Sequence, residues 1–184
     1  MSVMFADVRG FTSMAEQMNP SAVAARLNRF YDIASKAIFR YDGTLDKLVG
    51  DEVMAFFGAP LDSHDHPRRA VLSALEIMRE VAAIAAKDKL DIGVGIATGV
   101  AFVGNVGGAG VTDYTVLGDT VNIAARLQSA AAPGEILIFQ ETYRQVKTDF
   151  PRAARRELDL KGKSESVTAW EIAVNNANSA PEND

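Results

Sequence analysis

Cysteine is absent from the sequence, so neither disulfide bonds nor thiolate chemistry contributes to fold or function. This composition suits a reducing compartment, and we expect a cytoplasmic protein or a cytoplasmic part of a larger one. No apolar run approaches the ~18 residues of a membrane-spanning helix. The first residues also lack the basic and then apolar segments of a secretory signal peptide. We therefore expect no membrane segment in this chain.

A basic excess is also missing. The formal net charge is −5 at pH 7, which argues against a general nucleic-acid-binding surface but permits one small anionic ligand held by a few lysines. The 184 residues are 48% hydrophobic and 23% charged, which is typical of a globular protein with a substantial core. We predict one domain over residues 1–174. Residues 175–184 lack apolar content and are predicted to form a disordered tail.

The order of the predicted elements indicates a split βαββαβ arrangement. In chain order they are a strand at 3–6, a loop at 8–13, a helix at 20–41, a strand hairpin at 47–58, a loop at 62–67, a helix from there to 82 and a strand at 90–97. The first helix begins with Asn19 as its cap and Pro20 in its first turn. We therefore predict an α+β fold with a ferredoxin-like core, in which helices pack around an antiparallel-rich mixed sheet.

Additional C-terminal helices and strands are expected to follow this core. They are a strand at 100–103, a glycine-rich loop at 104–110, an extended stretch at 114–117, a helix at 118–127 and late strands near 136–138, 157–160 and 167–174. The stretch VMAFF at 53–57 is apolar on both faces of its strand, so both faces of the sheet must be covered. The sequence leaves open whether later elements or a partner subunit cover the second face.

Asp7 and Asp51 are the first candidate site residues. Asp7 follows the first strand and Asp51 stands in the hairpin turn, so a sheet with a central first strand brings both to one region. Neighbouring carboxylates repel each other unless a cation lies between them, and Mg²⁺ prefers one or two carboxylates plus waters and phosphates. On spacing alone, the alternative that both aspartates only cap turns is favoured.

Further residues fit a phosphate-bearing ligand. Backbone N–H groups of Gly10, Phe11 and Thr12 follow Asp7 near a helix start, where phosphate oxygens bind well, although a plain loop is the alternative. Asn122 and Arg126 lie four residues apart on one helix face and suit sugar and phosphate oxygens. The alternative for this pair is a solvated helix face.

Two lysine positions and one threonine complete the candidates. Lys47 stands in a segment that is otherwise apolar, so it either reaches solvent or binds something. Thr115 has a hydroxyl that donates or accepts, although threonine is also common in strands. Lys161, with Lys163 as the alternative, lies beside a glycine and either reaches a phosphate or belongs to a charged turn.

Taken together, these stretches resemble the catalytic domain of the class III nucleotide cyclases. The matching stretches are FADVRGFT at 5–12, LDKLVGDEVMAFFG at 45–58, VGNVG at 103–107, DYTVLGDTVNIAARL at 113–127 and LKGK at 160–163. They occur in order over nearly the whole chain, and five spaced motifs are far more specific than any one of them. The alternatives in which these residues only cap turns or face solvent are therefore set aside.

The resemblance implies that the protein makes a cyclic nucleotide and pyrophosphate from a nucleoside triphosphate. It implies that Asp7 and Asp51, with the carbonyl of Val8, hold two Mg²⁺ or Mn²⁺ ions. One ion favours loss of the ribose 3′-hydroxyl proton, and the other anchors the β- and γ-phosphates. By the same resemblance, Asn122 orients the ribose and Arg126 stabilises charge on the α-phosphoryl group. Lys161 corresponds to the lysine that binds the terminal phosphate.

Residues 47 and 115 bear on the choice of base. Lys47 donates and Thr115 accepts, which matches N1 and the N6 amine of adenine, whereas guanylate-making members typically carry glutamate and cysteine at these positions. We therefore predict an adenylate cyclase that uses ATP. Threonine at 115 resembles a subgroup with bicarbonate-responsive members, so bicarbonate or CO₂ is an expected activator.

The filled set of site positions predicts a homodimer with two sites at the subunit interface, and further regulatory domains are expected outside this chain. The alternatives are a guanylate cyclase and a non-catalytic nucleotide-binding sensor domain that uses the fold for dimerisation.

Overall fold

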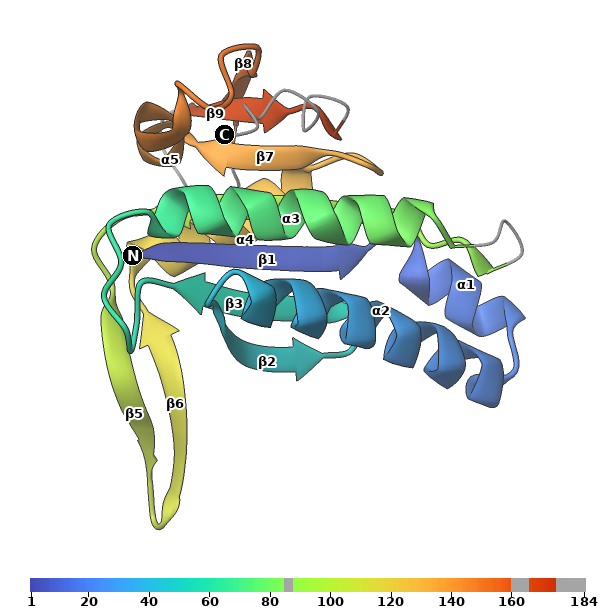
Figure 1. Ribbon diagram of the computed structural model, residues 1–184. Coiled ribbons are helices and arrows are strands. Elements are labelled where there is room, and N and C mark those ends of the chain that lie inside the picture. The colour runs from blue at the N-terminus through green and yellow to red at the C-terminus, as the bar shows by residue number, and fades with distance from the viewer. Residues whose placement is uncertain (85–87, 160–165, 175–184) are drawn as a thin grey trace.

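We analysed a computed structural model of the chain, which describes residues 1–84, 88–159 and 166–174 (Figure 1). The helices are α1 Phe11–Gln17, α2 Pro20–Arg40, α3 His66–Ala82, α4 Asp119–Ala130 and α5 Gln140–Val146. The strands are β1 Ser2–Val8, β2 Thr44–Val49, β3 Glu52–Phe57, β4 Ile92–Thr98, β5 Phe102–Gly108, β6 Val111–Leu117, β7 Ile136–Phe139, β8 Ala154–Leu158 and β9 Val167–Ile172. The α+β fold class predicted from the sequence is confirmed.

A sheet with the strand order β2-β3-β1-β4-β7-β9-β8 forms the centre of the molecule. Its first four strands are the predicted ferredoxin-like core, because β1 lies between β3 and β4 and pairs antiparallel with both. β7 then adds parallel to β4, and the remaining pairs are antiparallel. The mixed, antiparallel-rich sheet places the end of β1 near the centre of the fold.

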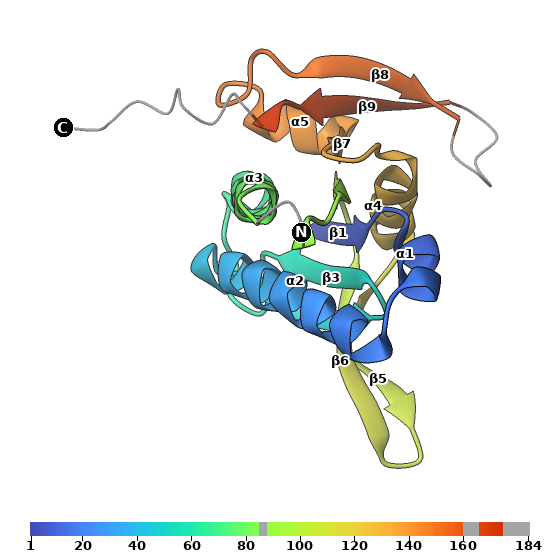
Figure 2. The ribbon, with the colours of Figure 1, turned by 90° about the vertical axis from the view of Figure 1, so that its right-hand side faces the viewer.

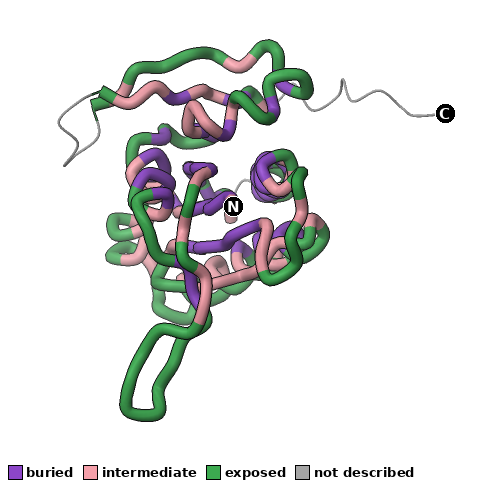
Figure 3. Tube along the Cα trace, turned by 90° about the vertical axis from the view of Figure 1, so that its left-hand side faces the viewer, coloured by how far each residue is buried: buried purple, intermediate pink, exposed green. Residues whose placement is uncertain are grey.

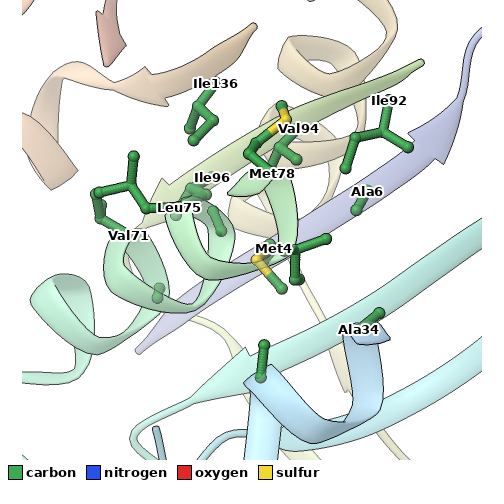
Figure 4. Close-up of a cluster of buried hydrophobic side chains, with 14 of the residues drawn as sticks. Met4, Ala6, Ala34, Val71, Leu75, Met78, Ile92, Val94, Ile96 and Ile136 are labelled. Atoms are coloured by element: carbon green, nitrogen blue, oxygen red, sulfur yellow. The ribbon is translucent and has the colours of Figure 1, made fainter. Parts of the chain in front are cut away.

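Helices α2 and α3 cover one face of the sheet, and α4 covers the other (Figures 1 and 2). On the first face, Met4 and Ala6 of β1 pack with Val94 and Ile96 of β4 and with the apolar stripe of α3 (Figure 4). This stripe includes Val71, Leu75 and Met78 as expected, but its last buried member is Val81 rather than Ala82, which is exposed.

The opposite side chains of β1 lie in a second cluster under α4. Val3 and Phe5 pack there with Phe56 of β3 and Leu127 of α4. A later element of the same chain therefore covers much of the second sheet face, which the sequence had left open. Burial of both faces explains why residues 53–57 are apolar at every position.

Strands β5 and β6 form a separate two-stranded arm that projects from the body and is largely exposed (Figure 3). The expected strand at 100–103 begins only at Phe102 and continues to Gly108, so the prediction of a loop at 104–110 is largely wrong. The cross-strand hydrogen bonds of a hairpin hold this glycine-rich segment extended, since Val103 pairs with Val116 and Gly108 with Val111.

Local signals at the helix ends agree with the sequence in one place and differ in another. The side chain of Asn19 accepts a hydrogen bond of 2.9 Å from the N–H of Ser21, which is the predicted cap of α2. The predicted loop at 8–13 is wrong in its second half, because α1 begins at Phe11.

Among the described residues, no helix combines the length and apolarity needed to cross a membrane. Residues 175–184, predicted to form a tail, lie outside the described residues.

Gly95 is expected to be essential for the packing of α4 on the sheet. A Cβ atom at this position would overlap backbone atoms of Ala124 and Gln128. Gly95→Ala should therefore lower the free energy of unfolding by about 1–3 kcal/mol, since a packed backbone cannot yield. Urea unfolding of both proteins measures this difference.

Gly108→Ala is the matched control, because no atom lies within 4 Å of a Cβ there and its backbone is ordinary. It should change the unfolding free energy by no more than about 0.5 kcal/mol. Equal effects of the two substitutions would show that α4 does not pack closely on Gly95.

Candidate active site

Asp7 lies near the carboxyl end of β1, on the sheet face that α4 covers. Val3 and Phe5 precede it on the same face, so the apolar layer turns polar at this position. In the sheet register, Asp7 stands between Glu52 of β3 and Gly93 of β4. Gly93 has no side chain, and this leaves space beside the carboxylate.

Asp51 occupies the turn between β2 and β3, next to Asp7. The turn requires Gly50, whose φ of +62° favours glycine. The N–H of Val8 donates to the carbonyl of Asp51 at 3.3 Å, and the Tyr31 hydroxyl donates to the carbonyl of Gly50. These contacts fix the turn against β1. Burial and then the charge of Asp51 raise the pKa of Asp7 to about 6.

Arg9 is a site residue that the sequence interpretation missed. Its Nη1 lies 3.4 Å from a carboxylate oxygen of Asp7, and its Nη2 donates to the carbonyl of Gln128 in α4. A Cβ at Gly93 would overlap the guanidinium, so this glycine makes the space that Arg9 fills. The sequence did contain one signal for this contact. Arg9 lies two residues after Asp7, and residues two apart in an extended chain face the same side.

The two carboxylates fit a divalent cation that keeps some non-protein ligands. Within the described ranges, no group of three or more histidine, cysteine or acidic side chains is arranged to hold a metal ion. A donor set of Asp7, Asp51 and one carbonyl such as that of Val8 leaves several positions to water and phosphate oxygens, as Mg²⁺ prefers. The mutual repulsion of the carboxylates also favours a cation between them.

The segment that was predicted to bind phosphate, residues 10–12, lies just after the end of β1. Gly10 has a φ of +69° and ends the turn that leads from β1 into α1. Phe11 and Thr12 form the first turn of this helix, where N–H groups have no partner within the helix. Helix α1 thus begins inside the segment that the sequence predicted as a loop, and phosphate binding by this segment stays a prediction.

Lys47 and Thr115 are brought together by a third residue, Asp46. The Lys47 Nζ lies 3.1 Å from one carboxylate oxygen of Asp46, and the Thr115 hydroxyl donates to the other at 2.6 Å. Lys47 also contacts Asp113 of β6 at 3.4 Å, and the Asp46 hydrogen bond is the main cause that raises the pKa of Lys47. The sequence interpretation named Lys47 and Thr115 but not the aspartate between them.

Asn122 and Arg126 lie on α4 on the side away from the buried stripe. Asn122 is exposed and Arg126 half-buried, whereas Ile123 and Leu127 pack on the sheet. Neither side chain hydrogen-bonds or pairs with a residue in the described part of the chain, so both remain available to a ligand. Lys161 and its alternative Lys163 lie outside the described residues.

Comparison with known proteins agrees with this arrangement. Residues 1–173 match the family model for the adenylate and guanylate cyclase catalytic domain. An adenylate cyclase of Anabaena cylindrica is 30% identical over 94% of this chain, which covers 36% of that protein. The chain therefore spans about a third of this relative's length.

Solved structures of cyclases share the fold. The guanylyl cyclase Cya2 has a TM-score of 0.88 at 30% identity, covering 93% of this chain and 90% of that one. The adenylyl cyclase CyaB from P. aeruginosa has a TM-score of 0.78 at 35% identity, covering 94% of this chain and 92% of that one. The match of residues 1–173 to the family model and the fold shared with solved cyclases lead to one conclusion: the chain belongs to the adenylate and guanylate cyclase catalytic domain family.

Proposed function

We propose that this domain is an adenylate cyclase, which converts ATP to 3′,5′-cyclic AMP and pyrophosphate. The observation that carries the choice of ATP is the contact of Lys47 and Thr115 through Asp46. A lysine N–H suits the N1 acceptor of adenine, and a threonine oxygen suits its N6 amine. The comparisons include both adenylate and guanylate cyclases, so they support the reaction type and leave the base to this residue argument.

In this proposal, each group acts at a stated part of the nucleotide. Asp7 and Asp51 hold two Mg²⁺ or Mn²⁺ ions, which when bound supply positive charge at the attacking and leaving oxygens. The N–H groups of the first turn of α1 bind phosphate oxygens. Asn122 holds the ribose in place for attack by its 3′-oxygen on the α-phosphorus. Arg126 stabilises the negative charge that builds on the α-phosphoryl oxygens.

The proposed assembly is a homodimer in which both subunits complete each site. Exposed apolar side chains gather on the arm, where Phe102, Val111 and Leu117 are 56%, 75% and 48% exposed. Leu48 and Val49 of the neighbouring hairpin are also exposed. Apolar surface of this kind marks a contact region, and the arm reaches beyond the body of one subunit (Figure 3).

Two other functions stay as candidates. A guanylate cyclase is favoured by the guanylyl cyclase among the similar structures, and disfavoured by the donor at Lys47. A non-catalytic nucleotide sensor is disfavoured because Asp7, Asp51, Asn122 and Arg126 are all present. Activation by bicarbonate, a cytoplasmic location, further regulatory domains and a phosphate contact from Lys161 remain predictions from the sequence.

The direct test is turnover by the purified chain. With ATP and Mn²⁺ it should release cyclic AMP and pyrophosphate, and it should do so faster than it converts GTP. Specific activity should rise with protein concentration, because two subunits share each site. Chromatographic quantification of the cyclic product across protein concentrations gives both results. ATP binding without turnover would instead favour the sensor domain.

Removal of either metal-binding carboxylate tests the metal assignment. Asp7→Ala and Asp51→Ala should each lower kcat more than about a hundredfold, since charge neutralisation at both oxygens is lost. Asp32→Ala removes an exposed carboxylate that pairs with Lys36 on α2, and it should leave the rate unchanged. Retained activity in the Asp7 or Asp51 variant contradicts the assignment.

The raised pKa of Asp7 predicts how stability depends on pH without metal. The pKa is about 6 in the folded chain against an ordinary 3.8, so stability falls as pH rises through about 6 and Asp7 ionises beside Asp51. Asp7→Asn removes this loss and should stabilise the metal-free protein by about 1–2 kcal/mol at pH 7.5, allowing for the partial exposure of the carboxylate.

Thermal unfolding in chelator at pH 4.5 and 7.5 measures the effect. The advantage of Asp7→Asn should be about three times larger at pH 7.5 than at pH 4.5, because the loss of stability begins near the unfolded-state pKa of 3.8 and is complete only above about 6, while Asp32→Asn should show no such difference. A variant no more stable than the wild type at pH 7.5 would mean that burial and the charge of Asp51 do not raise the pKa of Asp7 in the folded chain.

A further inference from the structure

The carboxylate of Asp46 is buried, and a buried carboxylate requires a physical explanation. Its side chain has no exposed surface, yet it contacts both residues assigned to the base. An unpaired buried carboxylate is strongly unfavourable, but here an ammonium and a hydroxyl occupy its two oxygens. We propose that Asp46 is a positioning residue that sets the preference for adenine by fixing which hydrogen-bonding groups Lys47 and Thr115 present. This inference rests on the proposed function.

A β-bulge brings the three residues together. Leu45 pairs with Ala55 and Lys47 with Met54, so Asp46 is an extra residue in β2 with no partner in β3. Neighbouring residues in a regular strand point to opposite faces, and a bulge re-aims one of them. Asp46 and Lys47 therefore both reach β6, where they contact Thr115 and Asp113.

The hydrogen bonds can then be counted. The Thr115 hydroxyl gives its only proton to Asp46, so the free side of its oxygen can only accept. The Lys47 ammonium has three N–H groups, of which Asp46 and Asp113 take two, and one remains to donate. One acceptor and one donor are what the N6 amine and N1 of adenine require. Guanine presents an acceptor at O6 and a donor at N1, so it fits poorly.

Asp46→Asn tests this account with little change in shape. The amide can donate to Thr115, which frees the hydroxyl proton to face the O6 acceptor of guanine. The ratio of kcat/KM for ATP to that for GTP should fall about tenfold or more, because the site no longer enforces an acceptor. Steady-state kinetics with Mn²⁺ and each nucleotide measure the ratio. A ratio within about twofold of the wild type overturns the inference.

A double-mutant cycle shows whether the effect passes through Thr115. Thr115→Val should also lower the ratio, and adding Asp46→Asn to it should lower the ratio no further. Asp113→Asn is the matched control, because it removes a 70% exposed carboxylate from Lys47 without touching Thr115, and it should shift the ratio much less. Additive effects in the cycle, or an equal effect of Asp113→Asn, contradict the proposal.

Two further measurements distinguish a failure of this inference from a failure of the variant to fold and from a failure of the proposed function. If Asp46→Asn does not fold, Asp46→Ser should shift the ratio in the same direction, since serine donates as well as accepts. If the wild type turns over neither nucleotide, the proposed function fails, and the ratio of dissociation constants for ATP and GTP replaces the kinetic ratio. A purely structural role for Asp46 would lower the unfolding temperature and leave either ratio unchanged.

Discussion

The negative charge of Asp51 lies close enough to Asp7 to oppose the ionisation of its carboxyl group, and much of the site follows from this contact. The contact exists because β1 is central in the sheet and the hairpin turn is bonded to its end. Burial and the charge of Asp51 raise the pKa of Asp7, and the nearby Arg9 opposes this shift without cancelling it. The fold thus holds two carboxylates together at a cost in stability, which cations bound at the proposed metal site would remove.

The sequence predicted those parts of the fold that local patterns determine. Apolar periodicity, the Asn19 cap and the hairpin turn are sufficient for the βαββαβ core, and Asp7 and Asp51 meet as expected. Helix α1 was missed because it is short, buries no residue and lacks a side-chain cap. The arm was missed in part because glycine is a poor strand former, and pairing between β5 and β6 overrides that preference.

The site residues that were missed share one cause. Asp46 contacts Lys47 only because a bulge breaks the alternation of the strand, and no residue pattern marked the bulge. Arg9 reaches Asp7 only because Gly93 on another strand leaves room for it. Both contacts depend on tertiary register, whereas the residues that we propose to bind the ligand itself were recognisable from motifs. The supporting residues therefore needed the structure.

Our central proposal is that both subunits of a homodimer complete each site. Asp51, in the turn between β2 and β3, would then bind the metals of one site, and Lys47 of the same hairpin would bind the base in the other site. Mixing Asp51→Ala and Lys47→Glu subunits, each inactive alone, tests this directly through cyclic AMP formation. Half of the dimers that form should contain one subunit of each variant, and each of these has one intact site out of two. The mixture should therefore show about a quarter of wild-type activity. A mixture no more active than the two variants assayed separately would contradict the shared site.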